Sequence, residues 1–130
     1  PHSRIDGELP VGGEQPLVIE FTLDGAPMMI LNGGPHYPQT PAASISVLTD
    51  SQEETDRLWY ALTANGGRES RCGWLLDRWG VSWQIVPRRL PQLLGAGDRA
   101  AAARAQAALM AMNRIDIAAL EAAFANVQEQ

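Results

Sequence analysis

The chain has 130 residues, of which 45% are hydrophobic, and ten basic against fifteen acidic residues give a formal net charge of −5. The acidic excess argues against a nucleic-acid partner, because phosphate binding draws on clustered positive charge. No apolar run approaches the ~20 residues that a membrane span requires, so we also expect no membrane partner.

All ten basic residues are arginine, and the single cysteine is Cys72. Without lysine, Schiff-base chemistry and a lysine-dependent phosphate loop are excluded. A lone cysteine cannot form an internal disulfide, which fits a reducing compartment. Residues 1–13 are polar and glycine-rich, unlike a secretory signal. We therefore expect a cytoplasmic protein.

The first part of the chain predicts a small set of strands. Glycine and proline in residues 1–16 predict a loop, with at most a short strand over residues 3–5. Residues 17–23 alternate between apolar and polar side chains, as a strand does. Asp24-Gly25 is typical of a hairpin turn. Residues 28–31 are apolar on both sides, so the returning strand is expected to be buried.

The clearest predicted helix spans residues 51–65, after an alternating strand over residues 43–49. Ser51 and Glu54 have the spacing of a capping box, and Gly66-Gly67 is typical of a helix end. Four apolar residues are expected to form the stripe that packs on a sheet. These are Leu58, Trp59, Ala61 and Leu62.

A tryptophan-rich segment follows this helix. Residues 69–72 predict a short strand, residues 77–80 a turn and residues 81–86 a second strand. Alternation puts Val81, Trp83 and Ile85 on one face and Ser82, Gln84 and Val86 on the other face. The order strand, helix and three strands predicts one compact unit.

Beyond Pro87 the composition shifts to alanine and leucine. Residues 88–94 predict a short helix, Asp98 caps a helix to about residue 113, and Asp116 caps another to about residue 127. The apolar stripe of the last helix is Ile117, Leu120, Phe124 and Val127, with Ile115 as a staple to Leu120. Such helices are expected to cover a sheet edge or form a dimer contact.

Four segments resemble the PhnB-like, or 3-demethylubiquinone-9 3-methyltransferase-like, branch of the vicinal oxygen chelate superfamily. They are residues 32–36, 52–59, 72–74 and 77–87, and residues 114–117 are similar too. The superfamily includes glyoxalases, fosfomycin-resistance proteins, bleomycin-binding proteins and extradiol dioxygenases.

The resemblance implies an α+β fold in which βαβββ modules form a curved, partly open sheet around a cavity. We expect a single domain, residues 1–130, with a partial first module (1–41), a complete second module (42–87) and a C-terminal helical extension (88–130). The first module is N-terminally incomplete, because family members begin with a further strand and helix. Either the chain is a truncated version or a partner supplies this wall, and a homodimer is expected.

The resemblance also implies a ligand cavity on the concave face, with Val81, Trp83 and Ile85 on the side toward the helices. Its expected lining is Glu20, Thr22, Met29, Ser44, Ser46, Trp74, Ser82 and Gln84. Within this lining, Trp74 is a candidate to stack on a ligand; the alternative is that it belongs to the core. In related metal enzymes this face carries the metal ligands, and here Gln84, Met29 and Ser44 occupy the corresponding positions. These are poor ligands for Zn²⁺, Fe²⁺ or Mn²⁺, so no metal and no other cofactor are expected.

No residue is a strong catalytic candidate. Cys72 follows Arg71 and could be a nucleophile, although an inert half-buried strand cysteine is the favoured interpretation. His36 is either a general base at the cavity mouth or a loop residue. Glu20 is either a buried acid or base or a solvated strand residue. Whether the protein is an enzyme stays open.

The sequence thus predicts binding of a small organic ligand without a catalytic metal. One alternative is a divalent-metal-dependent lyase, transferase or dioxygenase of the glyoxalase or fosfomycin-resistance type. A methyltransferase, which the branch's label suggests, is disfavoured because no Gly-x-Gly loop follows a strand and opens a helix.

Overall fold

The structure is a computed structural model that describes residues 2–10, 13 and 15–126. The chain divides into two compact units, Pro1–Pro38 and Gln39–Gln130. We call them the N-terminal unit and the C-terminal unit and describe each by itself. Across the described residues, every helix is too short or too polar to span a lipid bilayer.

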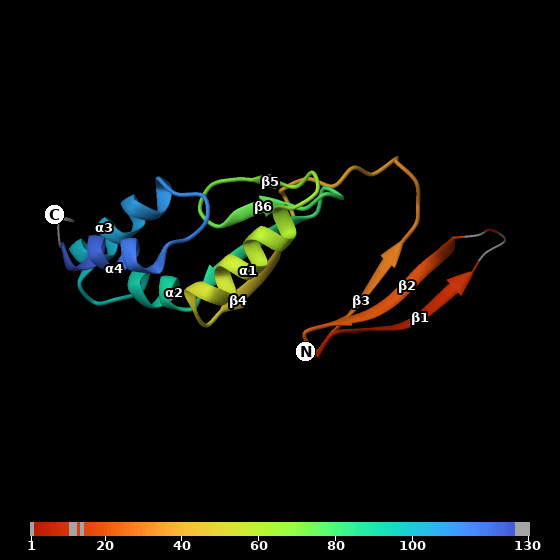
Figure 1. The fold of residues 1–130 in the computed structure, drawn as a ribbon, viewed down its shortest axis with the longest axis horizontal. Helices are drawn as coiled ribbons and strands as arrows, with labels where there is room; N and C mark the ends of the chain where they lie inside the picture. Colours follow the sequence, from red (N-terminus) through yellow and green to blue (C-terminus); the bar gives the residue numbers. More distant parts are fainter. Residues whose placement is uncertain (1, 11–12, 14, 127–130) are drawn as a thin grey trace. The chain divides into compact units, whose positions relative to one another are not determined.

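The N-terminal unit is a three-stranded antiparallel sheet in the order β1-β2-β3 (Figure 1). Its strands are β1 (Arg4–Pro10), β2 (Pro16–Leu23) and β3 (Ala26–Leu31). The turn between β2 and β3 has positive φ at Asp24 (47°) and Gly25 (83°). This left-handed pair matches the twist of a two-residue hairpin, so the predicted turn is confirmed.

Two predictions for this unit are wrong. The expected loop over residues 1–16 contains the seven-residue strand β1, whose pairing with β2 outweighs the glycine and proline and shifts register between Ile5 and Gly7. Strand β3 was expected to be buried, yet Met29 is 62% and Leu31 62% exposed. Among the described residues of the N-terminal unit, strand β3 pairs with β2 alone and is therefore an edge strand of this sheet.

The C-terminal unit contains a four-stranded sheet in the order β4-β7-β6-β5. Its elements are β4 (Ile45–Thr49), α1 (Gln52–Thr63), β5 (Arg68–Glu69), β6 (Trp74–Leu76) and β7 (Ser82–Pro87). Strands β4 and β7 are parallel, and the other neighbours are antiparallel. The predicted order of strand, helix and three strands is confirmed.

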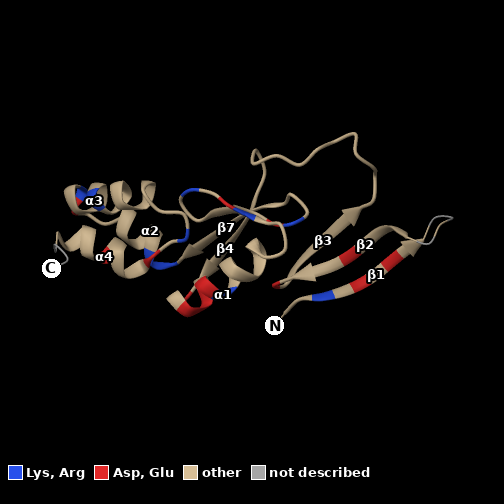
Figure 2. Cartoon of the chain, turned by 45° about the horizontal axis from the view of Figure 1, so that its top comes forward, with Lys and Arg blue, Asp and Glu red and all other residues tan. Residues whose placement is uncertain are grey.

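Helix α1 packs on one face of this sheet through Trp59, which is fully buried against Leu75 and Ile85. Ser51 Oγ accepts a hydrogen bond from the Glu54 N–H (3.1 Å), so the predicted cap is confirmed. The Glu54 carboxylate in turn accepts from the Asp50 N–H (2.9 Å). Figure 2 shows the resulting acidic cluster at the start of α1, where it complements the helix dipole.

The predicted stripe of α1 is wrong at one position. Leu58 and Leu62 pack with Trp59 on the sheet, but Ala61 is exposed. At 3.6 residues per turn, Ala61 lies to one side of the face centred on Trp59 and Leu62. Alanine is common on both buried and exposed helix faces, so its residue type does not predict burial. Only its angular position on the helix shows that Ala61 lies outside the buried stripe.

Three helices follow the sheet: α2 (Arg89–Leu94), α3 (Arg99–Met110) and α4 (Ile117–Ala125). Their buried side chains form a second core around Leu93, Ala105, Leu109, Ile115 and Leu120. Both predicted caps are confirmed, because the carboxylates of Asp98 and Asp116 accept from N–H groups three residues later. The predicted stripe residue Val127 lies outside the described residues.

The β5–β6 turn attaches these helices to the sheet. The N–H groups of Cys72 and Gly73 donate to the carbonyls of Met112 (2.9 Å) and Asn113 (2.7 Å). Cys72 has a positive φ of 60°. The predicted strand over residues 69–72 is therefore confirmed only at Glu69 and is wrong at Ser70, Arg71 and Cys72. Cys72 lies in a turn, where its N–H bonds to the segment that connects α3 and α4 rather than to a neighbouring strand.

Helix α1 contacts the same connecting segment between α3 and α4. The Gln52 side-chain amide donates to the Ile115 carbonyl (3.0 Å) and accepts from the Ile117 N–H (2.8 Å). Arg114 forms an ion pair with Asp56 at 2.6 Å. We call the connecting segment, residues 112–117, the junction. It joins the C-terminal helices to both the sheet and α1.

The junction leaves no room for a side chain at Gly73. Gly73 has a φ of +82°, and an added Cβ would lie 2.7 Å from Ile115 Cδ1 and 2.9 Å from the Ile85 carbonyl oxygen. Gly80 has a similar φ of +87°, but nothing lies within 4 Å of an added Cβ. A substitution by alanine would therefore strain the backbone at both positions, but it would cause a steric clash only at Gly73.

We expect Gly80→Ala to lower the free energy of unfolding by about 1–2 kcal/mol, through left-handed backbone strain alone. Gly73→Ala should cost about 1–3 kcal/mol more, since it also overpacks a filled site. Urea denaturation followed by tryptophan fluorescence measures both values. Equal losses for the two variants would show that the junction does not pack tightly on the turn.

Candidate functional site

The sheet of the C-terminal unit has one covered face and one open face. Trp83 and Ile85 of β7 face α1 and pack around Trp59, as predicted. Ser82 is in register with Leu76, and Gln84 with both Trp74 and Ser46, which places these side chains on the opposite side. We call this side the open face. It carries Ser44, Ser46, Arg68, Trp74, Leu76, Ser82 and Gln84.

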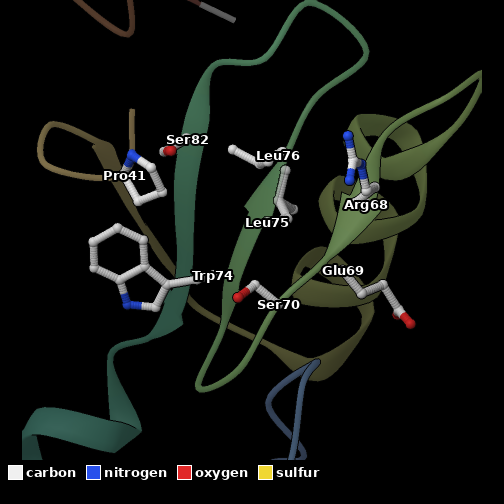
Figure 3. Close-up of a pocket in the computed structure, with 8 residues that line it drawn as sticks. All are labelled: Pro41, Arg68, Glu69, Ser70, Trp74, Leu75, Leu76 and Ser82. Atoms are coloured by element: carbon white, nitrogen blue, oxygen red, sulfur yellow. The ribbon is translucent and has the colours of Figure 1, made fainter. Parts of the chain in front are cut away.

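A cavity of about 160 Å³ lies on the open face between β5, β6, β7 and the loop before β4 (Figure 3). Figure 3 shows the Trp74 indole extending alongside the Pro41 ring, while the Glu69 carboxylate points away from both. Eight residues line the cavity: Pro41, Arg68, Glu69, Ser70, Trp74, Leu75, Leu76 and Ser82. Two of the residues predicted for a ligand cavity, Trp74 and Ser82, are thus brought together.

Ser82 is the unusual member of this lining. It is only 3% exposed, and its Oγ has no hydrogen-bond partner among the described residues. A buried hydroxyl without a partner costs about 1–3 kcal/mol. Ser82 also lines the cavity, so its unused hydroxyl is a candidate donor for a molecule bound there.

The two charged residues of the lining, Arg68 and Glu69, differ in their bonds to other side chains. The Glu69 carboxylate accepts a hydrogen bond from Trp59 Nε1 at 2.6 Å, on the side of helix α1. Arg68 is in register with Leu76 on the open face, and no carboxylate of the described residues forms a salt bridge with it. The cavity lining therefore has an arginine without an ion pair among the described residues and a carboxylate that is hydrogen-bonded to Trp59.

The other predicted residues of the C-terminal unit lie outside this cavity. The Gln84 amide donates to Ser44 Oγ at 2.8 Å, and Ser46 is exposed on the adjoining strand. Cys72 Sγ contacts the Leu109 carbonyl (3.6 Å) and Met110 Sδ (3.7 Å), away from the cavity lining. Pairing with Ser44 uses part of the hydrogen-bonding capacity of Gln84.

The N-terminal unit has a hollow of its own, of about 340 Å³. It is lined by Asp6, Glu20, Phe21, Pro27, Met28 and Met29. Glu20 and Met29, both predicted as cavity residues, are register partners there, whereas His36 is an exposed turn residue outside the hollow. Thr22 is buried and donates its hydroxyl to Asp6 at 2.7 Å.

Asp6 was missed because residues 1–16 were expected to form a loop. The alternation of Arg4, Asp6 and Glu8 is the signal that marks a strand with a polar face. The pKa of the Asp6 carboxyl is lowered, chiefly by the hydrogen bond from Thr22; desolvation opposes this shift, and the nearby Arg4 guanidinium adds to it. Asp6 is thus held ionised beside Glu20 in the hollow.

Sequence comparison identifies the family. The profile of the 3-demethylubiquinone-9 3-methyltransferase family matches residues 2–86, well over half of the chain. The chain belongs to this family. The matched region ends within β7 and does not include α2, α3 and α4. A comparison with curated proteins finds no match.

Solved structures show a similar fold. The PhnB protein of Bacillus cereus, described as a 3-demethylubiquinone-9 3-methyltransferase, is 25% identical with a TM-score of 0.59, over 65% of this chain and 79% of that one. Protein PA1353 of Pseudomonas aeruginosa is 20% identical with a TM-score of 0.52, over 65% of this chain and 77% of that one. The fold is α+β and PhnB-like, with two open sheets and C-terminal helices.

The open face fits a metal ion poorly. Gln84, which the resemblance implies as a metal-ligand position, already donates to Ser44. Within the described part of the chain, no group of three His, Cys, Asp or Glu side chains could hold a metal ion. The open face offers one amide, Gln84, and three hydroxyls, Ser44, Ser46 and Ser82, in place of the imidazole and carboxylate donors that Zn²⁺, Fe²⁺ and Mn²⁺ favour.

The turn before Ser82 is fixed by Asp77. Its carboxylate accepts from the N–H groups of Trp79 (2.9 Å) and Val81 (3.0 Å) and from Trp83 Nε1 (2.9 Å). Asp77 is only 7% exposed, so water contributes little to satisfying it. These three bonds set where β7 begins and hence on which face Ser82 lies.

We expect Asp77→Asn to lower the free energy of unfolding by about 2 kcal/mol, because the amide has one acceptor oxygen for three donors. Asp50→Asn is the matched control. It removes an exposed ion pair with Arg88 and should cost less than about 1 kcal/mol. Urea denaturation of both variants gives the comparison, and a similar small loss at Asp77 would contradict its anchoring role.

Thr22→Val should raise the pKa of Asp6 toward its ordinary value, because the strongest hydrogen bond to the carboxylate is lost. A lowered pKa in the folded state stabilises the fold above the unfolded-state pKa, and this contribution disappears as pH falls through the folded pKa. In the variant, Asp6 should protonate at higher pH. Carbon-13 NMR titration of the carboxyl tests this, with Thr40→Val as control. An unchanged Asp6 titration would contradict it.

Proposed function

We propose that this protein binds a small organic ligand in the cavity of the open face and needs no catalytic metal for it. The carrying observation is the buried, unpartnered Ser82 hydroxyl in a cavity that also presents Trp74 and Arg68. Apolar walls with a few polar groups are typical of small-molecule sites. The PhnB-like fold, whose sheets leave a face uncovered by helices, supports the same conclusion.

Binding without methyl transfer is favoured by the connection between β4 and α1. Nucleotide-type cofactors are held at a glycine-rich turn between a strand and a helix, where free backbone N–H groups meet phosphates. Here the connection is Asp50-Ser51, without glycine. The Ser51 and Glu54 side chains already bond the exposed N–H groups of Glu54 and Asp50.

We further propose a cytoplasmic homodimer. Apolar side chains on the N-terminal sheet support a dimer: Ile5 is 70% exposed, Met29 62% and Leu31 62%. Strand β3 has a partner strand on one side only within the N-terminal unit, and open edges favour pairing with another chain. Size-exclusion chromatography with light scattering tests this. A mass near the 14.1 kDa of one chain would contradict it.

Ligand binding is tested by native mass spectrometry of the purified protein, alone and with a library of one-ring and two-ring compounds. We expect adducts with the wild type that disappear in Ser82→Leu, which fills the cavity. Ser46→Leu makes the same change on the open face outside the cavity and should keep them. Adducts that persist in Ser82→Leu would place binding elsewhere and overturn the proposal, and circular dichroism confirms that each variant is folded.

A further inference from the structure

We propose that the ligand is a single-ring aromatic acid with a second polar substituent, such as a hydroxyl, at the far end of the ring. This inference rests on the proposed function and specifies its ligand class. Arg68 binds the acid, Trp74 and Pro41 hold the ring, and Ser82 donates to the second substituent. Each part follows from a different property of the cavity.

The size of the cavity limits the ligand to one ring. Its volume is about 160 Å³. Drug-sized ligands occupy pockets of roughly 300–1,000 Å³, whereas an engineered apolar cavity of about 150 Å³ in another protein takes benzene. A fused ring system or a long aliphatic chain would therefore extend out of the cavity into solvent.

The walls of the cavity favour a flat ring. Trp74 and Pro41 present ring faces, and Leu76 adds an aliphatic surface between β5 and β7 (Figure 3). The half-buried Trp74 indole is free to stack, because β6 places it on the open face, away from the core of Trp59 and Ile85. Aromatic rings gain from offset stacking on such a surface beyond simple burial.

The polar groups of the cavity lie at its two sides. Arg68 and Ser82 flank Leu76 in register on neighbouring strands, so their backbones are about 10 Å apart at a strand spacing of about 4.8 Å. This separation suits a ring that carries one polar group at each end. A compact anion such as phosphate would reach one of the two residues and leave the other unused.

The charge of the cavity selects an acid. A guanidinium pairs with a carboxylate through two parallel hydrogen bonds. Among the described residues Glu69 forms no ion pair with Arg68; its carboxylate accepts from Trp59 Nε1 and, in Figure 3, points away from the Trp74 and Pro41 rings. At the other side, the Ser82 hydroxyl lacks a partner and can donate to a ring hydroxyl or carbonyl oxygen.

The experiment compares three probes by isothermal titration calorimetry on the full chain: 4-hydroxybenzoate, benzoate and 4-hydroxybenzyl alcohol. The wild type should bind 4-hydroxybenzoate about fivefold more tightly than benzoate, as expected for one hydrogen bond. It should bind 4-hydroxybenzoate at least about tenfold more tightly than the alcohol, as expected for a charge-assisted pair.

The variants assign each preference to one residue. Ser82→Ala should abolish the preference for the ring hydroxyl and keep the preference for the acid, whereas Arg68→Gln should do the reverse. Trp74→Leu should weaken all probes by about tenfold. The matched controls Ser46→Ala, Arg57→Gln and Trp79→Leu lie outside the cavity lining and should change affinities less than about twofold.

The free energy of unfolding of Ser82→Ala shows whether the Ser82 hydroxyl contacts the ligand or has a structural role. Ser82→Ala removes an unsatisfied buried hydroxyl, so the free protein should be no less stable than the wild type while it loses the hydroxyl preference. A destabilised Ser82→Ala would mean that the hydroxyl is bonded within the protein, which overturns its assigned role.

The outcomes distinguish this inference from the proposed function. Equal binding of the acid and the alcohol, or preferences unaffected by Arg68→Gln and Ser82→Ala, would overturn the ligand class while cavity binding stands. Failure of the wild type to bind any of the three probes would also overturn it. Failure of the proposed function itself shows separately, as library adducts that survive Ser82→Leu.

Discussion

Trp59 determines how the C-terminal unit is organised. Its ring is fully buried between helix α1 and the sheet, which decides the face that α1 covers and the face that stays open. Its Nε1 donates to Glu69 at 2.6 Å and so turns that carboxylate toward the helix. The same contact leaves Arg68 as the available charge of the cavity. One core side chain thus sets both the packing and the electrostatic character of the open face.

The C-terminal helices act on the cavity through the β5–β6 turn. The junction bonds to the N–H groups of Cys72 and Gly73, and the Gly73 carbonyl accepts from the Ile85 N–H. Trp74 follows directly, so its backbone is held between the helical core and β7. The family match ends at residue 86, yet this addition restrains a residue of the candidate site. These helices therefore support the site as well as the fold.

Local patterns explain what the sequence could predict. Alternation in β7 and the caps at Ser51, Asp98 and Asp116 depend on neighbours along the chain, and all were predicted correctly. The errors involve distant partners. Strand β1 forms despite its glycine and proline because β2 pairs with it, and Cys72 turns because Met112 accepts its N–H. The cavity residues Pro41 and Arg68 were missed, since only the assembled sheet brings them together.

Residues with the same sequence-based prediction differ in whether their polar groups have hydrogen-bond partners in the structure. Ser44, Ser82, Gln84 and Thr22 were all expected to line a cavity, and each is a polar residue on an alternating segment. In the structure the Gln84 amide donates to Ser44 Oγ and the Thr22 hydroxyl donates to Asp6, so these side chains have hydrogen-bond partners within the protein. Ser82 is buried with an unused hydroxyl. Burial without a partner is favourable only when something else offsets its cost, and a bound ligand is the simplest source of that compensation.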